Sequence, residues 1–237
     1  MIAAWLKNHF TQVWWFLFFS AALPGLQLIF RYFTDMLGSN PLETLTLTTG
    51  RAALVLLTVT LAVTPMRKLL MNISRTVAAK DGKRLSDWNW LVRTRRLFGL
   101  WSFTYAVVHT WIFLEFDIDY DWLLGWEEIN EKPYIAVGTL ALLLLVPIAA
   151  TSTNRMMQLL GKYWRPLHML SYPIAVLALL HFWWLTKAGL WKPLPETIVL
   201  GIFLGYRLLL HTKYIQRWEG SDGREVPERT GRQHLTR

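Results

Sequence analysis

The sequence predicts an all-α membrane protein: a polytopic helix bundle with six transmembrane helices and both termini in the cytoplasm. First, 53% of the 237 residues are hydrophobic, and several uncharged runs approach twenty residues, the length that an α-helix needs to cross a bilayer. Second, many of the 14 Trp lie near the ends of these runs, as in the aromatic belts of membrane proteins. Third, successive loops, except the one after the fifth span, alternate between basic and acidic residues, which is typical of chains that cross a membrane repeatedly.

Each expected span is long enough to cross a hydrocarbon core of about 30 Å at about 1.5 Å per residue. The first, Phe10–Phe30, follows Lys7 and contains small residues at 20–22, as a signal peptide would, but its apolar run continues through Ile29. We therefore expect a retained helix. The other expected spans are Leu45–Met66, Leu97–Leu114, Pro133–Asn154, Pro166–Thr186 and Thr197–His211.

The loops predict the orientation of the bundle. The loop between the second and third spans has two acids, Asp81 and Asp87, against nine bases: Arg67, Lys68, Arg75, Lys80, Lys83, Arg84, Arg93, Arg95 and Arg96. Such a loop is expected in the cytoplasm. The next loop has seven acids before its first base, Lys132, and is expected on the outer side. The loop after the fourth span has three bases and no acid, so it returns to the inside.

The chain divides into a six-span domain, residues 1–212, and a charged tail, residues 213–237, which we expect to be a mobile cytoplasmic segment because it has no apolar periodicity. The net charge of +9 comes largely from the basic loop. These bases lie beside spans rather than on a soluble domain. The charge therefore indicates how the chain is oriented in the membrane, with lipid as a partner, and it disfavours nucleic acid as a partner.

The absence of Cys excludes several kinds of redox site. With no Cys in the sequence, disulfides, thiolate-ligated haem, Cys-ligated iron-sulfur clusters and Cys-based zinc sites are ruled out. Metal chemistry must depend on the six His, the Met residues or carboxylates.

Three His lie within expected spans, where ionisable groups are costly and usually functional. His109 is 12 residues after Leu97 (109 − 97), and His181 is 15 residues after Pro166 (181 − 166). Both spans run outward, so both side chains are expected at matched depth in the outer half. Two neutral imidazoles from neighbouring helices can ligate one haem iron from opposite faces, which favours electron transfer.

His168 is expected near the cytoplasmic edge, 13 residues before His181 (181 − 168), or about 20 Å along a helix. This is the separation that a second haem would require, although the two side chains face one interior only if the helix bends, for which Pro173 is the expected cause. No second His is available at this depth. Arg95 and Arg96 lie there instead and are candidates to bind haem propionates or a flavin or quinone head group.

Simpler interpretations remain open for some of these residues. An intramembrane His is also found as a structural residue that hydrogen-bonds across helices, and for His168 both interpretations stand. Arg51 and Arg207 lie inside expected spans. Each either extends its guanidinium group to the interface or binds an anionic group of a cofactor.

Over nearly its whole length the sequence resembles the ferric-reductase-like transmembrane family. The resemblance lies in Thr49-Gly50-Arg51, in the run from Arg95 to Leu100 with His109 beyond it, in the run from Leu160 to His168, and in His181-Phe182-Trp183-Trp184. It implies b-type haem, one or two per chain, held by His109, His168 and His181. It also places Trp164, within the third motif, among the candidate cofactor-binding residues.

More narrowly, the chain resembles the haem-binding membrane subunits of bacterial periplasmic protein-methionine-sulfoxide reductase systems. This implies an inner-membrane location, association with FMN, and electrons from the quinone pool or a cytosolic flavin reductase. It also implies a periplasmic molybdopterin subunit as partner. The chain has no GxGxxG fingerprint, so we expect an electron-transfer subunit that has no catalytic residues of its own.

Two alternatives come from other functional classes. A secondary transporter would also place His and Arg within its spans, but it should show broken repeats in its two halves, and the sequence contains none. A non-redox membrane anchor would not need two His at matched depth.

Overall fold

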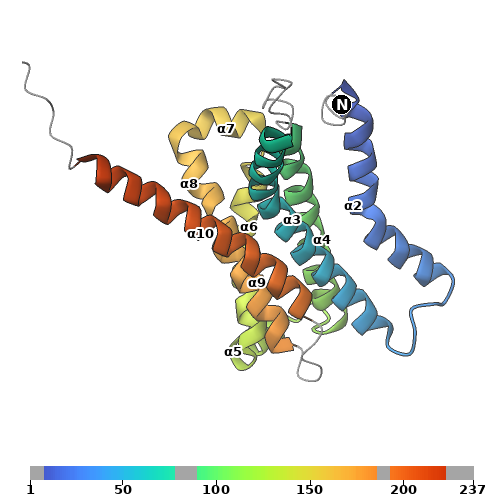
Figure 1. Cartoon of the computed structure of the whole chain (residues 1–237). Coiled ribbons are helices and arrows are strands. Elements are labelled where there is room, and N and C mark those ends of the chain that lie inside the picture. The colour runs from blue at the N-terminus through green and yellow to red at the C-terminus, as the bar shows by residue number, and fades with distance from the viewer. Residues whose placement is uncertain (1–7, 78–89, 186–192, 223–237) are drawn as a thin grey trace, which may run out of the picture.

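The computed structural model describes residues 8–77, 90–185 and 193–222, and within them every regular element is a helix (Figure 1). The middle of the predicted basic loop, residues 78–89, and the end of the predicted tail, residues 223–237, lie outside the described residues. The helices are α2 Phe10–Phe33, α3 Pro41–Val77, α4 Trp90–Phe116, α5 Trp122–Glu131, α6 Pro133–Ala150, α7 Asn154–Leu160, α8 Trp164–Met169, α9 Ser171–Leu185 and α10 Leu194–Asp222, with a short 3-10 helix, Gly161–Tyr163, before α8.

The prediction of an all-helical, multi-pass membrane protein is confirmed. Five stretches of the described chain are long and apolar enough to cross a membrane: Phe10–Phe33, Pro41–Ile73, Trp90–Phe116, Pro133–Ala150 and Asn154–Leu185. The sixth predicted span falls within α10, which is not among these five stretches of the described chain and which continues past Lys213 to Asp222. Large apolar side chains point outward, as on α2, where Phe16 is 72% exposed.

The core lies where α3, α6, α9 and α10 meet. Its buried side chains are small or aliphatic: Leu57, Leu61, Ala141, Leu145, Ile148, Ile174, Ala175 and Leu200. Close packing of this kind drives helix association in lipid, where the hydrophobic effect between helices is absent. Polar contacts add to it, and the Ser102 hydroxyl on α4 donates to the Ala53 carbonyl on α3 at 2.8 Å.

α2 lies at the edge of the bundle and bends midway along its length (Figure 1). Pro24 lies within it and cannot donate a backbone hydrogen bond. The Tyr105 hydroxyl of α4 enters the backbone ladder at this point: it accepts from the Gly25 amide at 2.9 Å and donates to the Ala21 carbonyl at 3.0 Å. Tyr105 therefore ties α2 to α4 at the proline.

The segment expected as one continuous fifth span is two helices, because α8 ends at Met169 and α9 begins at Ser171. Pro173 lies within the first turn of α9, and its ring excludes the carbonyl of the residue four positions earlier, Met169. The break therefore falls one turn before the expected kink residue. The predicted acidic outer loop contains a short helix, α5, whose N-cap is Asp121.

Candidate functional site

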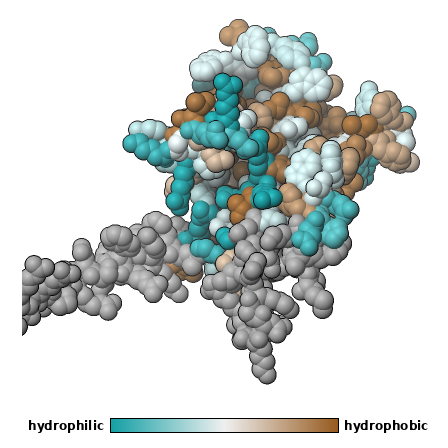
Figure 2. Space-filling model, turned by 90° about the horizontal axis from the view of Figure 1, so that it is seen from above, coloured by the Kyte–Doolittle hydropathy of each residue, from teal (hydrophilic) through white to brown (hydrophobic). Residues whose placement is uncertain are grey.

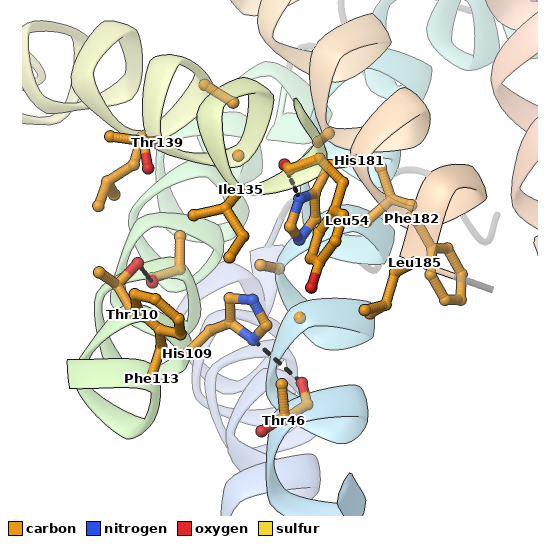
Figure 3. Close-up of a pocket in the computed structure, with 18 of the residues that line it drawn as sticks. Thr46, Leu54, His109, Thr110, Phe113, Ile135, Thr139, His181, Phe182 and Leu185 are labelled. Atoms are coloured by element: carbon orange, nitrogen blue, oxygen red, sulfur yellow. Dashed lines mark hydrogen bonds between the residues drawn. The ribbon is translucent and has the colours of Figure 1, made fainter. Parts of the chain in front are cut away.

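A cavity of about 700 Å³ lies between α3, α4, α6 and α9 at the end of the bundle predicted to face outward. This volume is within the usual range for small-molecule and cofactor sites, about 300–1,000 Å³. Its walls are mostly apolar, with Leu54, Phe113, Ile135 and Leu185 among the side chains that line it (Figure 3). Both His109 and His181 reach into it from opposite walls.

His109 is oriented by a backbone contact from a neighbouring helix. Its Nδ1 lies 3.0 Å from the carbonyl oxygen of Thr46 on α3, and the Thr49 hydroxyl lies 3.5 Å from the same nitrogen. Because a carbonyl can only accept, Nδ1 must donate. The neutral ring then carries its lone pair on Nε2, which is the tautomer that binds a metal through Nε2.

His181 is held in the same way from the opposite side. Its Nδ1 lies 2.6 Å from the carbonyl oxygen of Tyr134 on α6, so this ring also has Nε2 available as an acceptor or ligand. The two ring centroids are 6.0 Å apart and the ring planes are 85° apart. The expectation of matched depth therefore agrees with the structure.

This arrangement fits a bis-His haem site in its donor set and spacing. With metal–nitrogen bonds of about 2 Å, two imidazoles on opposite sides of one metal ion have ring centres about 6 Å apart. Among the described residues no group of three or more His, Asp and Glu gathers as a metal site. The donor set here is a pair of imidazoles, a pair that haem iron accepts.

Two glycines give the rings room against the neighbouring helices. A Cβ added at Gly138 on α6 would lie 2.7 Å from the His181 Nδ1, and one added at Gly50 on α3 would lie 3.0 Å from the His109 Cε1. Neither glycine was identified as a site residue from the sequence. Gly50 belongs to the Thr49-Gly50-Arg51 motif, which provided a signal, whereas Gly138 is an ordinary small residue in an apolar run.

Charged residues surround the outer rim of the cavity. The Arg51 Nε lies 2.6 Å from the Glu196 Oε1, and the carboxylate is 6% exposed while the arginine is 56% exposed. Arg51 therefore lines the cavity but is already paired with α10, a contact that the sequence did not reveal. Lys132 Nζ donates to Glu128 at 2.7 Å, which raises the pKa of Lys132. Burial and the neighbouring Glu128 charge raise the pKa of Asp117.

A second cluster gathers around His168. The Trp164 ring stacks on the His168 ring, with centroids 4.0 Å apart, and its indole donates to the Thr151 carbonyl at 3.0 Å. The His168 Nδ1 lies 3.0 Å from the Trp164 carbonyl. Its Nε2 has only a long contact, 3.5 Å, with the Ser152 hydroxyl.

Two of the predicted arginines join this cluster. Arg207 places its guanidinium carbon 4.5 Å from the centre of the Tyr172 ring, and Arg95 lies close enough to Tyr172, Arg207 and His168 to interact with their charges. Within the described part of the chain, the Arg95 Nε and the Arg207 Nη1 are buried without a hydrogen-bond partner. Buried cationic donors of this kind are costly, and an anionic group bound between them would satisfy both.

Arg96 does not join its neighbour. Its Nη1 donates to the Asn154 side chain at 2.9 Å, and the residue lines a groove against α2 instead. The structure thus brings His109 and His181 together at one end. It brings His168, Trp164, Arg95 and Arg207 together elsewhere, leaving Arg51 at the outer rim and Arg96 outside both groups.

The sequence matches a known protein family over the region that contains most of these residues. Residues 49–179 match the family model for "Ferric reductase like transmembrane component". This match covers Arg51, Arg95, Arg96, His109, Trp164 and His168 and ends two residues before His181.

Similar curated proteins share the name "Protein-methionine-sulfoxide reductase heme-binding subunit MsrQ". The protein from Herminiimonas arsenicoxydans is 42% identical over 195 residues, 82% of this chain and 81% of the relative. That from Xanthomonas campestris pv. campestris strain B100 is 42% identical over 74% of this chain and 73% of the relative. That from Ralstonia nicotianae is 41% identical over 79% of this chain and 81% of the relative.

Proposed function

Because this chain belongs to the ferric-reductase-like transmembrane family, and within it to the MsrQ haem-binding subunits, we propose that it is a b-type cytochrome. In this proposal it passes electrons across the bacterial inner membrane to a periplasmic, molybdopterin-containing methionine-sulfoxide reductase. The relatives are named as heme-binding subunits of a protein-methionine-sulfoxide reductase. The chain would act as an electron-transfer subunit and not as an enzyme on its own.

The observation that carries the proposal is the pair of oriented histidines. His109 and His181 each donate from Nδ1 to a backbone carbonyl, so both present Nε2 to one apolar cavity. We propose that they would hold the iron of an outer haem, which when bound would supply one-electron chemistry. Because two protein nitrogens would bind the iron, the residues favour electron transfer over oxygen binding.

The protein's own contribution is to orient the rings and to make room for them. The backbone carbonyls of Thr46 and Tyr134 fix the tautomers, and such outer contacts raise the basicity of a ligating imidazole. Gly50 and Gly138 let the rings lie against α3 and α6. The Arg51–Glu196 pair holds a guanidinium group at the rim, where it would favour an anionic cofactor group.

We propose that His168, Trp164, Arg95 and Arg207 hold a second, inner cofactor with anionic groups. The unpartnered guanidinium nitrogens of Arg95 and Arg207 support an anion between them. Both a second haem and FMN satisfy this requirement, and either the quinone pool or a cytosolic flavin reductase would supply the electrons. We propose that α10 is the sixth span, which would put both termini in the cytoplasm, as the charge pattern of the loops predicts.

A visible spectrum of the purified full-length chain, oxidised and then reduced with dithionite, tests the proposal. We expect a Soret band that shifts on reduction. Absence of that band when haem supply is adequate would contradict a cytochrome and favour a transporter or an anchor.

Substitutions then separate the two sites. His109→Ala and His181→Ala should each remove or convert the same haem signal, whereas His168→Ala should affect a different or additional one. His9→Ala, at the start of α2, is the matched control and should retain the wild-type spectrum. If His168→Ala alone abolished all haem while His109→Ala had no effect, the assignment of the outer ligands would be wrong.

A further inference from the structure

A groove of about 580 Å³ runs between α2 and α4, outside both candidate cofactor sites. Its walls are aromatic and aliphatic, with two arginines among them: Trp14, Phe18, Arg93, Arg96, Leu97, Leu100, Trp101 and Thr104. We propose that this groove binds one anionic phospholipid, with its head group on Arg93 and Arg96 and an acyl chain along α4.

The arginines lie at one end of the groove. α2 and α4 run parallel, since Arg93 lies over the ring of Phe10 at 5.3 Å while Tyr105 contacts Gly25. Arg93 and Arg96 are therefore at the end where both helices begin, which the loop charges assign to the cytoplasmic side. Figure 2 looks onto this end of the bundle and shows hydrophilic side chains beside apolar ones at the flanks.

The length of the groove matches one leaflet. Arg93 and Thr104 are 11 residues apart on α4 (104 − 93), or about 16 Å at about 1.5 Å per residue. Half of a hydrocarbon core of about 30 Å is about 15 Å. An acyl chain that lies along the groove from the arginines to Thr104 would therefore reach the middle of the bilayer. A free anion bound at the arginines would not.

The charges select an anionic head group. Within the described chain, the guanidinium group of Arg93 contacts the face of the Phe10 ring, and that of Arg96 donates from one nitrogen to Asn154, so both retain donors for phosphate oxygens. Basic pockets between transmembrane helices on the cytoplasmic side are typical sites for such lipids. The two arginines lie beside the leaflet that is rich in anionic lipid.

An unpartnered donor lies inside the groove, below the arginines. The indole Nε1 of Trp101 is buried and has no hydrogen-bond partner within the described chain, although its ring packs edge-on against Phe18 at 5.2 Å. Trp101 is five residues beyond Arg96 (101 − 96), or about 7.5 Å along the axis. A phospholipid places its ester carbonyls between phosphate and acyl chain, where they would accept from this N–H.

Native mass spectrometry tests the proposal. The full-length chain in detergent is titrated with dioleoylphosphatidylglycerol or dioleoylphosphatidylcholine, and the readout, bound lipid, does not depend on a cofactor. We expect one phosphatidylglycerol to bind in preference to phosphatidylcholine. Each arginine near an anionic group contributes about fivefold in affinity, so Arg93→Gln/Arg96→Gln should weaken phosphatidylglycerol binding by about 30-fold. Phosphatidylcholine binding should weaken much less, because the choline cation offsets the phosphate charge. The matched control, Arg155→Gln/Arg165→Gln, removes two exposed arginines outside the groove and should bind phosphatidylglycerol as the wild type does.

Further variants keep the test decisive if the double Gln variant folds poorly. Thr104→Trp fills the deep end of the groove at an exposed position and should weaken both lipids alike, while Trp101→Phe removes only the N–H and should weaken both by a few-fold. Equal loss in the control variant, unchanged binding in the groove variants, or equally tight binding of glycerol phosphate would overturn the proposal. Displacement of the lipid by decylubiquinone at a single site would also overturn it, since the groove would then be a quinone site.

Discussion

The rings of His109 and His181, from α4 and α9, have centroids 6.0 Å apart and lie almost perpendicular to one another. Each ring is oriented by a carbonyl on a third or fourth helix, Thr46 on α3 and Tyr134 on α6. Four helices thus converge on one pair of imidazoles. The groups that set the tautomers are backbone carbonyls. A side-chain substitution near the site can therefore displace a ring without removing its hydrogen-bond acceptor.

Gly138→Ala should displace His181. The added methyl carbon would lie 2.7 Å from Nδ1, and overpacking of this kind typically costs about 1–3 kcal/mol. We expect the ratio of bound haem to protein, measured by pyridine haemochrome, to fall several-fold. Gly50→Ala, with a contact of 3.0 Å, should have a smaller effect. Gly201→Ala is the control, since nothing lies within 4 Å of its added Cβ, and haem binding equal in Gly138→Ala and Gly201→Ala would refute the steric argument.

Arg51→Gln should destabilise the protein more than Glu196→Gln. The first change leaves a carboxylate that is 6% exposed without its partner, whereas the second leaves an arginine that is 56% exposed and reaches water. An unpaired buried group costs about 1–3 kcal/mol, and we expect Glu196→Gln to cost under about 1 kcal/mol because the remaining arginine is solvated. The free energy of unfolding in mixed detergent and SDS measures both. Equal losses would indicate that the carboxylate finds another donor.

Tyr105→Phe should weaken the attachment of α2. The change removes the hydroxyl that bonds the Gly25 amide and the Ala21 carbonyl beside Pro24, and hydrogen bonds between membrane helices are worth about 0.6–2 kcal/mol. We expect a loss in this range in the same unfolding assay. Tyr32→Phe, at a residue that is 64% exposed, should be neutral. A Tyr105→Phe protein as stable as Tyr32→Phe would show that the proline bend needs no support from α4.

Asp117→Asn should stabilise the protein at neutral pH. Although Asp117 is exposed on one side, partial burial and the charge of Glu128 raise its pKa above its ordinary value of 3.8, against the opposing charge of Lys132. A raised carboxyl pKa means that the folded state binds the proton more tightly than the unfolded state. The resulting stability is present below pH 3.8 and is lost as pH rises through the folded-state pKa.

The difference in unfolding free energy between Asp117→Asn and the wild type should therefore be near zero in acid and should favour the variant near pH 7. Unfolding curves at several pH values from 3 to 8 measure this difference. Asp119→Asn, at another exposed residue of the same loop, is the control. If the variant instead lost stability relative to the wild type as the pH rises, the difference would have the opposite sign and would contradict the raised pKa of Asp117.

Much of the fold was predictable because membrane insertion depends on local composition. Uncharged runs near twenty residues predicted the spans that the structure describes as long apolar helices. Counting residues from their starts predicted that His109 and His181 share a depth, since the rise per residue of a helix is nearly constant. The resemblance to ferric-reductase-like proteins rested on motifs in the chain and is shown by the family comparison.

Rotation and packing of the helices could not be predicted in this way. Arg95 and Arg96 are adjacent in sequence, but one turns toward Tyr172 and Arg207 while the other bonds Asn154. The sequence by itself determined which segments are apolar and how far along them the histidines lie. Only the tertiary structure decided which backbone carbonyl orients each ring, that Glu196 pairs with Arg51, and that Tyr105 supports the bend in α2. These contacts join residues far apart in the chain, and their geometry depends on how whole helices pack together.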